Sequence, residues 1–226
     1  MAASDPIADL SHVDTWIFDL DNTLYPPGHE VMALMEAKMT TFVARETGLP
    51  RDEARALQKR YLHEHGTTLA GLMAHHGIAP EPFLTEVHDI ALDSLEPDPA
   101  LAAGLARLPG RRLVFTNGDA RHAERILKKL QIEQLFEDVF HIASADYIPK
   151  PRPETFARMV ERHAVAPRQA AFFEDSERNL APAAEIGMTT VLVGPHAQLS
   201  RADFVHYRTA ELAPFLTGAK VKETPH

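Results

Sequence analysis

The chain has 226 residues, of which 45% are hydrophobic, enough for one sizeable domain or two small ones with buried cores. Its 32 acidic residues outnumber its 23 basic ones, and the net charge of −9 argues against a nucleic-acid partner because such a surface repels phosphate backbones. The absence of cysteine excludes disulfides and thiol catalysis. No segment is apolar enough to predict a membrane span, and the first residues carry no secretory signal, so we expect a soluble cytoplasmic protein.

The first predicted element is a short apolar strand at residues 16–18, which ends abruptly at Asp19 and Asp21. Alternate residues of an extended strand face the same side, so both carboxylates can point into one small volume. Two carboxylates this close repel each other unless a cation lies between them. The pair therefore predicts a divalent metal site and a reaction that involves charge.

The next stretch, residues 26–96, breaks the alternation of strands and helices seen elsewhere. Its apolar spacing predicts four helices, near residues 31–48, 52–65, 69–76 and 81–95, and prolines stand at both of its joints. We expect an all-helical cap inserted directly after the two aspartates, where it could cover them. Residues 1–25 and 97–217 would form the α/β core, and residues 218–226 a loose polar tail.

Three later apolar runs, at residues 112–115, 170–173 and 189–193, have the length and composition of strands buried on both faces. Helical patterns between them cover residues 119–130, 153–160 and 180–186. This alternation predicts an α/β fold, a Rossmann-like parallel sheet with helices on its faces.

Polar side chains stand where the predicted strands end, which is where open α/β sheets bind their ligands. They form four clusters along the chain: Asp19 with Asp21, Thr116 with Asn117 and Gly118, the lone Lys150, and Glu174 with Asp175. Together they supply a carboxylate nucleophile, a neighbouring acid, an anion holder, a lysine and a second acidic pair suited to a metal.

This set, in this order, resembles the haloacid dehalogenase superfamily, and the resemblance covers nearly the whole chain. The Asp-x-Asp-x-Thr motif is matched by Asp19, Asp21 and Thr23. The later motifs of the family are matched by Thr116, by Lys150 and by the acidic pair Glu174-Asp175. The helical insert after the first motif resembles the cap of the subfamily I.

The resemblance implies a role for each matched residue. Asp19 would attack phosphorus and become an aspartyl phosphate, while Asp21 would protonate the leaving alkoxide and later deprotonate water. Thr116 and the amides of Asn117 and Gly118 would hold the phosphoryl oxygens, and Lys150 would neutralise the charge. Mg²⁺ would bind Asp19, the main-chain carbonyl of Asp21, Asp175 and Glu174.

The dehalogenating and phosphonate-cleaving branches of the superfamily lack an aspartate at position 21, so Asp21 argues against both. The expected partner is a small phosphorylated metabolite, with neither nucleic acid nor membrane, and the protein could be a monomer or a homodimer. The histidine pairs 63/65 and 75/76 are not spaced as a helical zinc site requires, so we interpret them as surface or packing residues.

The substrate should be selected by the cap. The run Gly66-Thr67-Thr68, together with the sequence around Asp19, resembles the pyrimidine 5′-nucleotidase branch, which implies nucleoside 5′-monophosphates. On this hypothesis the cap-side contacts come from five residues, namely Tyr25, His29, His65, Thr67 and Thr68. Three alternatives stay open: a sugar or other small-metabolite phosphatase, a phosphomutase, and a catalytically silent module that binds a phosphorylated ligand.

Overall fold

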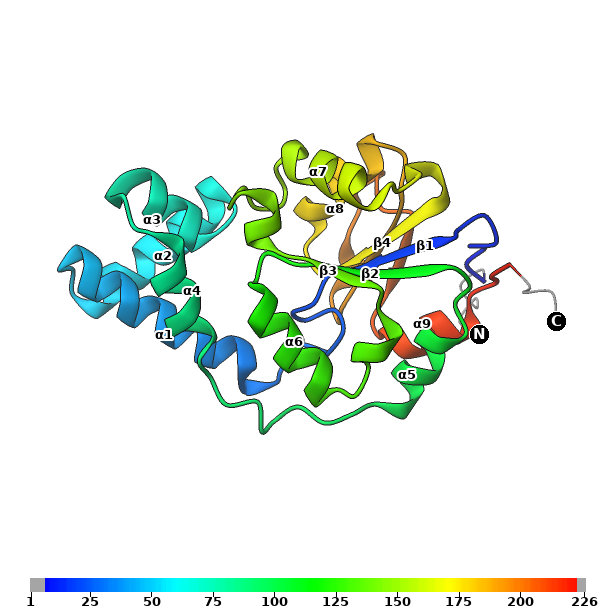
Figure 1. The fold of residues 1–226 in the computed structure, drawn as a ribbon, viewed down its shortest axis with the longest axis horizontal. Helices are drawn as coiled ribbons and strands as arrows, with labels where there is room; N and C mark the ends of the chain where they lie inside the picture. Colours follow the sequence, from blue (N-terminus) through cyan, green and yellow to red (C-terminus); the bar gives the residue numbers. More distant parts are fainter. Residues whose placement is uncertain (1–6, 223–226) are drawn as a thin grey trace.

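The computed structural model describes residues 7–222, and its centre is a parallel sheet of six strands in the order β3-β2-β1-β4-β5-β6 (Figure 1). The strands are β1 (Thr15–Phe18), β2 (Arg111–Phe115), β3 (Asp138–Phe140), β4 (Ala170–Glu174), β5 (Thr189–Val193) and β6 (Tyr207–Thr209). All five neighbouring pairs run parallel. The predicted α/β Rossmann-like fold is confirmed.

Both faces of the sheet are covered, and the period of two along each strand decides which residue goes where. Trp16 and Phe18 of β1 pack toward α5 (Pro99–Ala106), α6 (Ala120–Lys129) and α9 (Leu212–Gly218). Ile17, between them, packs toward α7 (Pro153–His163) and α8 (Glu177–Glu185). These two helices cover the other face of the sheet (Figure 1). Because β1 is buried on both sides, its sequence is apolar without alternation.

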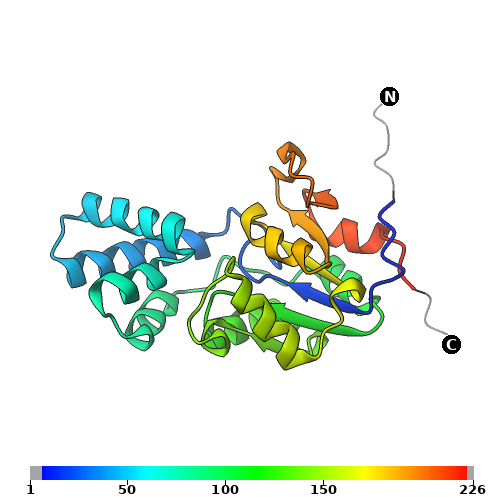
Figure 2. The same cartoon turned by 90° about the horizontal axis from the view of Figure 1, so that it is seen from above.

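Between β1 and β2 the chain forms four helices, α1 (Glu30–Thr47), α2 (Arg51–His65), α3 (Thr68–His76) and α4 (Pro80–His88), which we call the helical insert. They pack on one another beyond one end of the sheet (Figures 1 and 2). Phe42 and Phe83 meet edge to face at 5.1 Å between ring centroids. Gly71 lets α3 approach α2, because a Cβ there would lie 2.2 Å from the Tyr61 side chain.

The helical insert contacts the core at the C-terminal end of α2, around Leu62 and Gly66, which we call the tip of the insert. Arg178 of α8 donates to the carbonyl of Leu62 at 3.1 Å. Gly66, which follows α2, packs on the loop that carries Lys150, and a Cβ at this position would lie 2.9 Å from the Lys150 carbonyl oxygen. The backbone of Gly66 has φ +88°, a conformation that glycine adopts most easily.

Several elements differ from the sequence predictions. Strands β3 and β6 and helices α5 and α9 were not predicted, and neither were the short 3-10 turns Glu133–Leu135, Ile142–Ala145, Pro167–Gln169 and Ala197–Leu199. The fourth insert helix ends at His88 instead of continuing to Leu95. Asp89 leaves the helical conformation with ψ 72°, and Arg125 of α6 satisfies carbonyls at this end, donating to His88 O at 2.7 Å and Ile90 O at 2.6 Å.

The predicted tail also begins differently. Gly218 ends α9, and Lys220 pairs with the N-terminal segment, donating to Ala8 O at 2.9 Å and accepting from Leu10 N at 2.8 Å. The rest of the predicted tail, residues 223–226, and the N-terminal residues 1–6 lie outside the described part of the chain. Among residues 7–222 no helix is both long enough and apolar enough to cross a membrane.

Candidate active site

The carboxyl ends of three neighbouring strands bring the predicted site residues together. Asp19 follows β1, Thr116 follows β2, and Glu174 closes β4. Strand β1 lies between β2 and β4, so the chain leaves it in both directions across the sheet. The carboxyl ends on either side of such a switch point form a crevice, which is where α/β sheets place their ligands.

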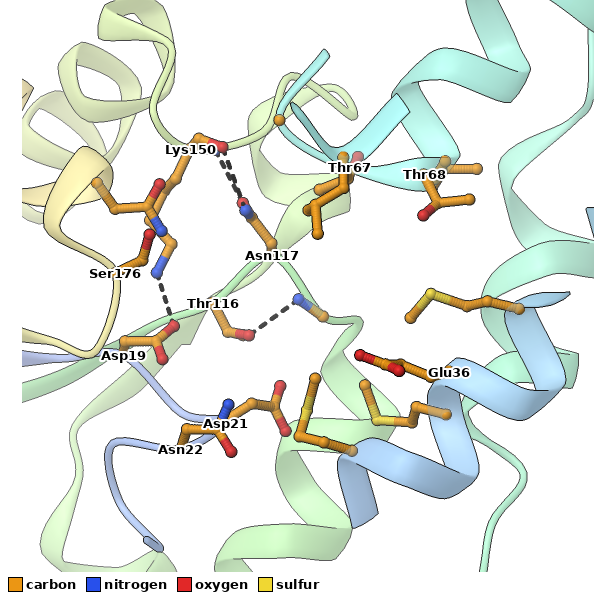
Figure 3. A pocket seen from close by; sticks show the side chains of 18 of the residues that line it. Asp19, Asp21, Asn22, Glu36, Thr67, Thr68, Thr116, Asn117, Lys150 and Ser176 are labelled. Carbon is orange, nitrogen blue, oxygen red and sulfur yellow. Dashed lines mark hydrogen bonds and ion pairs between the residues drawn. The ribbon is translucent and has the colours of Figure 1, made fainter. Parts of the chain in front are cut away.

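Lys150 joins two of these strand ends from a loop after β3. Its ammonium nitrogen donates to Asp19 Oδ1 at 2.7 Å, to Glu174 Oε2 at 2.8 Å and to the carbonyl of Phe115 at 2.7 Å. The side chain is 1% exposed, and its three N–H groups are all engaged. Figure 3 shows the side chain reaching down to Asp19. The lysine is therefore a fixed, buried charge.

The electrostatics of this cluster are dominated by burial. Burial and the negative charge of Glu174 raise the pKa of Asp19 to about 7, although Lys150 opposes the shift. Burial likewise raises the pKa of Glu174 to about 7, and burial with the charge of Asp19 raises the pKa of Asp175 to about 6. Burial alone would lower the pKa of Lys150, but the Asp19 and Glu174 carboxylates outweigh it and raise that pKa.

The acidic residues of the cluster could hold a metal ion. Asp19, Glu174 and Asp175 each offer an oxygen atom, and these oxygens lie within 4.8 Å of one another. When all three are ionised, these carboxylates outnumber the single ammonium group of Lys150 by two negative charges, which a divalent cation would balance. Carboxylate oxygens are the donors that hard cations such as Mg²⁺ prefer. The chemistry of the site therefore fits the predicted metal.

The two acids of the second pair are bound differently. Glu174 uses one oxygen for Lys150 and accepts the Ser176 amide with the other at 3.1 Å. Asp175 accepts a bond from the Asn22 amide group at 3.3 Å. Because both oxygens of Glu174 already have donors, Asp175 is the freer of the two for a metal. The main-chain carbonyl of Asp21 stays a predicted ligand.

The predicted phosphate-binding loop lies beside this cluster. The Thr116 hydroxyl accepts the Gly118 amide at 2.9 Å, and Thr116 lines the cavity. The Asn117 side chain ties down the lysine loop, accepting Lys150 N at 2.8 Å and donating to Lys150 O at 3.3 Å (Figure 3). Asn117 thus positions Lys150, and Gly118 would have to release the Thr116 hydroxyl before its amide could meet a phosphate.

Asp21 stands next to the cluster with partners of its own. Its Oδ1 accepts the Tyr25 hydroxyl at 2.6 Å and lies 2.8 Å from Nε2 of His122. Burial would raise the pKa of Asp21, but the charge and hydrogen bond of His122 and the bond from Tyr25 lower it to about 2. Asp19 and Asp21 therefore differ by their surroundings, one held by a lysine and the other by a histidine and a tyrosine.

A cavity of about 360 Å³ opens above these residues and extends into the helical insert. Its floor includes Asp19, Asp21, Thr116 and Lys150. Figure 3 shows Glu36, Thr67 and Thr68 on the insert side, facing Thr116 and Asn117. The remaining insert-side lining is mainly apolar: Met32, Met35, Met39, Leu62, Leu69, Phe83 and Leu84. The cavity has the size and apolar character of a small-molecule site.

The structure places the predicted cap-side residues in different surroundings. Tyr25 binds Asp21, His29 lies 2.7 Å from the carbonyl of Ser94, and His65 lies 3.0 Å from His75, and none of the three lines the cavity. Thr67 and Thr68 do line it. However, Thr67 also caps α3 by accepting the amide of Ala70 at 3.1 Å, which gives this residue a structural role in the turn.

Sequence reasoning missed His122, His88 and the methionines of α1. His122 lies four residues before Ile126 on the face of α6 that packs on the sheet, so its position on a buried stripe was a usable signal. His88 and the methionines reach the site only through the packing of the insert on the core, which no local pattern reveals.

The fold and the acidic cluster at the strand ends define the class of protein. Residues 13–187 match the family described as haloacid dehalogenase-like hydrolase, and the chain belongs to this family of hydrolases. The matched range contains the two aspartates, Thr116, Lys150 and the acidic pair.

Two curated proteins are similar to parts of this chain at 30–35% sequence identity. The chain is 30% identical over 193 residues to Phosphate metabolism protein 8 of Saccharomyces cerevisiae. This match covers 78% of this chain and 60% of the yeast protein. It is 35% identical over 109 residues to Fructose-1-phosphate phosphatase YqaB of Escherichia coli, covering 46% and 56% respectively. The chain thus spans less than two thirds of the length of these curated relatives.

A solved structure shares the fold across nearly the whole chain. The HAD phosphatase from Thermococcus onnurineus superposes with a TM-score of 0.59 at 20% identity, covering 92% of this chain and all of that one (100%). The uncovered fraction of this chain is shorter than the helical insert, so the likeness includes at least part of the insert as well as the sheet.

Proposed function

We propose that the protein hydrolyses phosphate monoesters with a divalent cation, through an aspartyl phosphate formed on Asp19. The observation that carries this proposal is the position of Asp19 on the cavity floor, held by Lys150 beside two further acids. A carboxylate fixed in this way can attack an electrophile without first reorganising. The names of the curated relatives, one a phosphatase and one a phosphate metabolism protein, agree with this chemistry.

In the first step a carboxylate oxygen of Asp19 forms a bond to phosphorus while the bond from phosphorus to the ester oxygen breaks. The departing alkoxide is a strong base and must receive a proton, which Asp21 supplies. The resting pKa of Asp21, about 2, has to rise for this. The negative charge of the entering phosphate acts in that direction, because a like charge nearby favours the protonated acid.

In the second step water attacks phosphorus and the bond to Asp19 breaks, releasing inorganic phosphate. Asp21, now ionised, accepts the proton of that water. Lys150 keeps its bonds to Asp19 and Glu174 through both steps and offsets their charge. Thr116 lies at the cavity floor, where its hydroxyl can donate to a phosphoryl oxygen.

A divalent cation would be held by Asp19 and Asp175, with Glu174 close by. When bound, such an ion offsets the charge that gathers on the phosphoryl oxygens. We propose Mg²⁺, because the available donors are carboxylate oxygens, the ligands that this hard cation prefers.

Dehalogenation, the other chemistry of this family, fits the site less well. A halide leaves without a proton, so an enzyme that displaces it needs no acid beside the nucleophile. Here Asp21 lies near Asp19, with two side chains dedicated to its orientation, Tyr25 and His122. A group held this firmly beside the nucleophile is the feature that phosphate ester cleavage requires.

We further propose that the helical insert is the cap of the site and that the substrate is a nucleoside 5′-monophosphate, as in the pyrimidine 5′-nucleotidase branch. Met35 and Phe83 are buried and present apolar surface to the cavity, while Glu36 adds a carboxylate to its lining. Gln58 also lines it and presents its amide NH₂ group, because its amide oxygen already accepts the Thr40 hydroxyl at 2.7 Å. A flat base has apolar faces and a polar rim, which matches this lining.

The second candidate is a sugar phosphate, which the name of the Escherichia coli relative favours. A sugar presents hydroxyl groups, and each of them needs a polar partner when it is buried. Against this candidate, seven of the insert-side residues at the cavity are methionine, leucine or phenylalanine side chains that offer no such partner: Met32, Met35, Met39, Leu62, Leu69, Phe83 and Leu84.

A phosphatase screen tests these proposals. UMP, CMP, fructose 1-phosphate and p-nitrophenyl phosphate are incubated with the protein in Mg²⁺ and in EDTA. We expect hydrolysis in Mg²⁺, loss of it in EDTA, and the highest kcat/KM on UMP or CMP. Activity on fructose 1-phosphate without activity on the nucleotides would remove the nucleotidase proposal while leaving the phosphatase intact.

The same panel separates an enzyme from a silent binding module. A module of that kind would hydrolyse none of the esters, yet a phosphorylated ligand would raise its melting temperature. The reactive groups of the proposed mechanism all line one cavity, which leads us to expect turnover instead.

A further inference from the structure

His122 is a fully buried polar side chain beside the proposed acid, although nothing in the family motifs points to it. It lies in the first turn of α6, is 0% exposed, and places Nε2 2.8 Å from Asp21 Oδ1. The Tyr25 hydroxyl donates to the same oxygen at 2.6 Å. An ionised carboxylate only accepts hydrogen bonds, so Nε2 carries the proton of this contact.

The two donors leave the other oxygen of Asp21 for chemistry. Oδ2 is on the side of the phosphate-binding loop, 3.9 Å from the position that a Cβ on Gly118 would take. With Oδ1 held from two directions, the carboxyl group cannot rotate, and the proton to be exchanged is confined to Oδ2. This arrangement aims the free oxygen at the cavity.

One flat face of the His122 ring is covered by a residue of the helical insert. His88, the last residue of α4, stacks on the imidazole with ring centroids 4.4 Å apart and an angle of 15° between the planes. His88 Nδ1 lies 3.2 Å from Asp119 Oδ2, and Asp119 caps α6 by accepting the amide of His122 at 2.6 Å. The insert therefore reaches the acid through one intervening side chain.

Arg125 fixes this contact from the core. One turn along α6 from His122, its guanidinium donates to the carbonyls of His88 and Ile90, at the point where α4 ends. The place where the insert rejoins the core is thus fastened to the same helix that carries His122. Movement of the insert away from the core would break both bonds and remove His88 from the imidazole.

We propose that His122 is a positioning residue that aims the Asp21 carboxyl group, and that His88 of the helical insert holds His122 in place, so that proton transfer to the leaving group is completed only when the insert is docked. This inference rests on the proposed role of Asp21 as the acid. Nδ1 of His122 has no hydrogen-bond partner among the described residues, so burying this ring has a cost that an apolar side chain would avoid. A role in packing alone would therefore not need a histidine, whereas the bond from Nε2 to Asp21 does need one.

The leaving group provides a direct test. p-Nitrophenolate departs without a proton, whereas an alkoxide needs one, so a misplaced acid slows the first turnover of an alkyl phosphate selectively. The first-turnover rates of both esters are measured by rapid quench, using as the alkyl ester whichever of UMP, CMP or fructose 1-phosphate the wild-type protein hydrolyses fastest. Three proteins are compared: wild type, His122→Leu and His122→Gln.

For His122→Leu we expect the first turnover of the alkyl ester to fall about 30-fold, part of what a general acid provides, and that of p-nitrophenyl phosphate to fall at most about threefold. His122→Gln should recover most of the loss, because its amide group can reach the place of Nε2. His63→Ala, an exposed histidine of α2, is the control for removing an imidazole from the protein.

His88→Ala completes the test. It retains the fully buried His122, so it tests the same contact if His122→Leu fails to fold. It should reduce the alkyl-ester rate about fivefold and have no further effect in the His122→Leu protein, since residues that act through one contact are not additive. Equal losses on both esters, or additive losses in the double variant, would overturn the inference.

The outcomes also separate this inference from the proposed function. If the wild-type protein hydrolyses neither ester, the phosphatase proposal is wrong and the role of His122 falls with it. If the wild-type protein hydrolyses both esters and His122→Leu leaves their ratio unchanged at an unchanged melting temperature, only the positioning role is wrong.

Discussion

The two sides of the cavity are built in opposite ways. On the core side, Lys150 binds three oxygens at 2.7–2.8 Å, and Asp19 and Glu174 are buried at the ends of strands. On the insert side, Met32 and Met39 are only half-buried and Glu36 is exposed. One side is a network of charged hydrogen bonds at the ends of strands, and the other is a methionine-rich apolar surface on helices.

This difference indicates that the core side carries the chemical reaction and that the insert side selects the substrate. Preorganised charge is what a transfer of a phosphoryl group needs, and it does not depend on the rest of the substrate. Methionine side chains adapt their shape to whatever packs on them, so they can select a substrate without fixing its chemistry. Changes on the core side should therefore affect every ester alike, and changes on the insert side should alter the ratio between esters.

The largest effect is expected for Asp19→Asn. The amide keeps the shape of the side chain but cannot attack phosphorus, so kcat should fall by roughly 10⁴-fold or more on every ester that the wild type accepts. Steady-state assays on two esters measure this. Asp93→Asn, an exposed acid at the joint between insert and core, is the control. A loss confined to one ester would contradict the assignment of the chemistry to the core side.

Lys150→Met should destabilise the fold as well as abolish activity. It removes the one ammonium group from a buried cluster with three carboxylates, and breaking a buried ion pair costs about 3–5 kcal/mol in the free energy of unfolding. Urea unfolding without metal measures this cost. Glu174→Gln in the same chain should recover part of it, because one of the unpaired charges is then gone. A single variant as stable as the wild type would show that Lys150 does not balance the acids.

The metal-free protein should lose stability as the pH rises. The pKa values of Asp19, Glu174 and Asp175 are raised to about 7, about 7 and about 6, from ordinary values of 3.8, 4.5 and 3.8. The folded state therefore holds these protons more tightly than the unfolded chain, and the resulting stability is lost between about pH 4 and pH 7. Asp21, whose pKa is lowered, opposes this trend only below about pH 4.

Mg²⁺ should reverse that loss. At about 100 times its Kd the ion adds about 2.7 kcal/mol, which corresponds to a rise of about 5–10 °C in melting temperature for a chain of this size. The rise should be larger at pH 7.5 than at pH 5.5, because protons compete for the same oxygens. Asp175→Asn should abolish most of the rise. An equal rise at both pH values would contradict binding at the acidic cluster.

A smaller effect, on the insert side, is expected for Gly66→Ala. The added Cβ would lie 2.9 Å from the carbonyl oxygen of Lys150, so the tip of the insert should dock less closely and KM should rise about tenfold. Gly48→Ala is a matched control, because Gly48 also has a positive φ, +69°, but nothing lies within 4 Å of its Cβ position. If both variants raised KM equally, backbone strain and not the contact with the core would be the cause.

The sequence predicted the parts of the fold whose pattern is local. Strands β1, β2, β4 and β5 are continuous apolar runs, and all four were predicted within one residue at each end. Strands β3 and β6 have three residues each, and most of these residues are only half-buried or exposed. Their sequences therefore contain no apolar run long enough to predict a strand. The fourth insert helix was predicted too long because the bonds that hold its end come from Arg125, which is distant in sequence.

The same distinction holds for the site. Asp19, Thr116, Lys150 and Glu174 were predicted because they follow strands or match an ordered set of motifs, and the structure brings them together. His88 was missed because it reaches Asp21 only through the packing of α4 on α6. Tyr25 was predicted to contact substrate, whereas its hydroxyl is used by Asp21. Such pairings depend on three-dimensional contacts that spacing does not reveal.

The central claim is that Asp19 becomes phosphorylated during turnover. The most direct measurement is to quench the protein during turnover of p-nitrophenyl phosphate, reduce it with borohydride, and map the peptides by mass spectrometry. An acyl phosphate is reduced to an alcohol, so we expect Asp19 to be recovered as homoserine, with Asp21 unchanged. Complete turnover with Asp19 unmodified, or homoserine at another position, would contradict the mechanism.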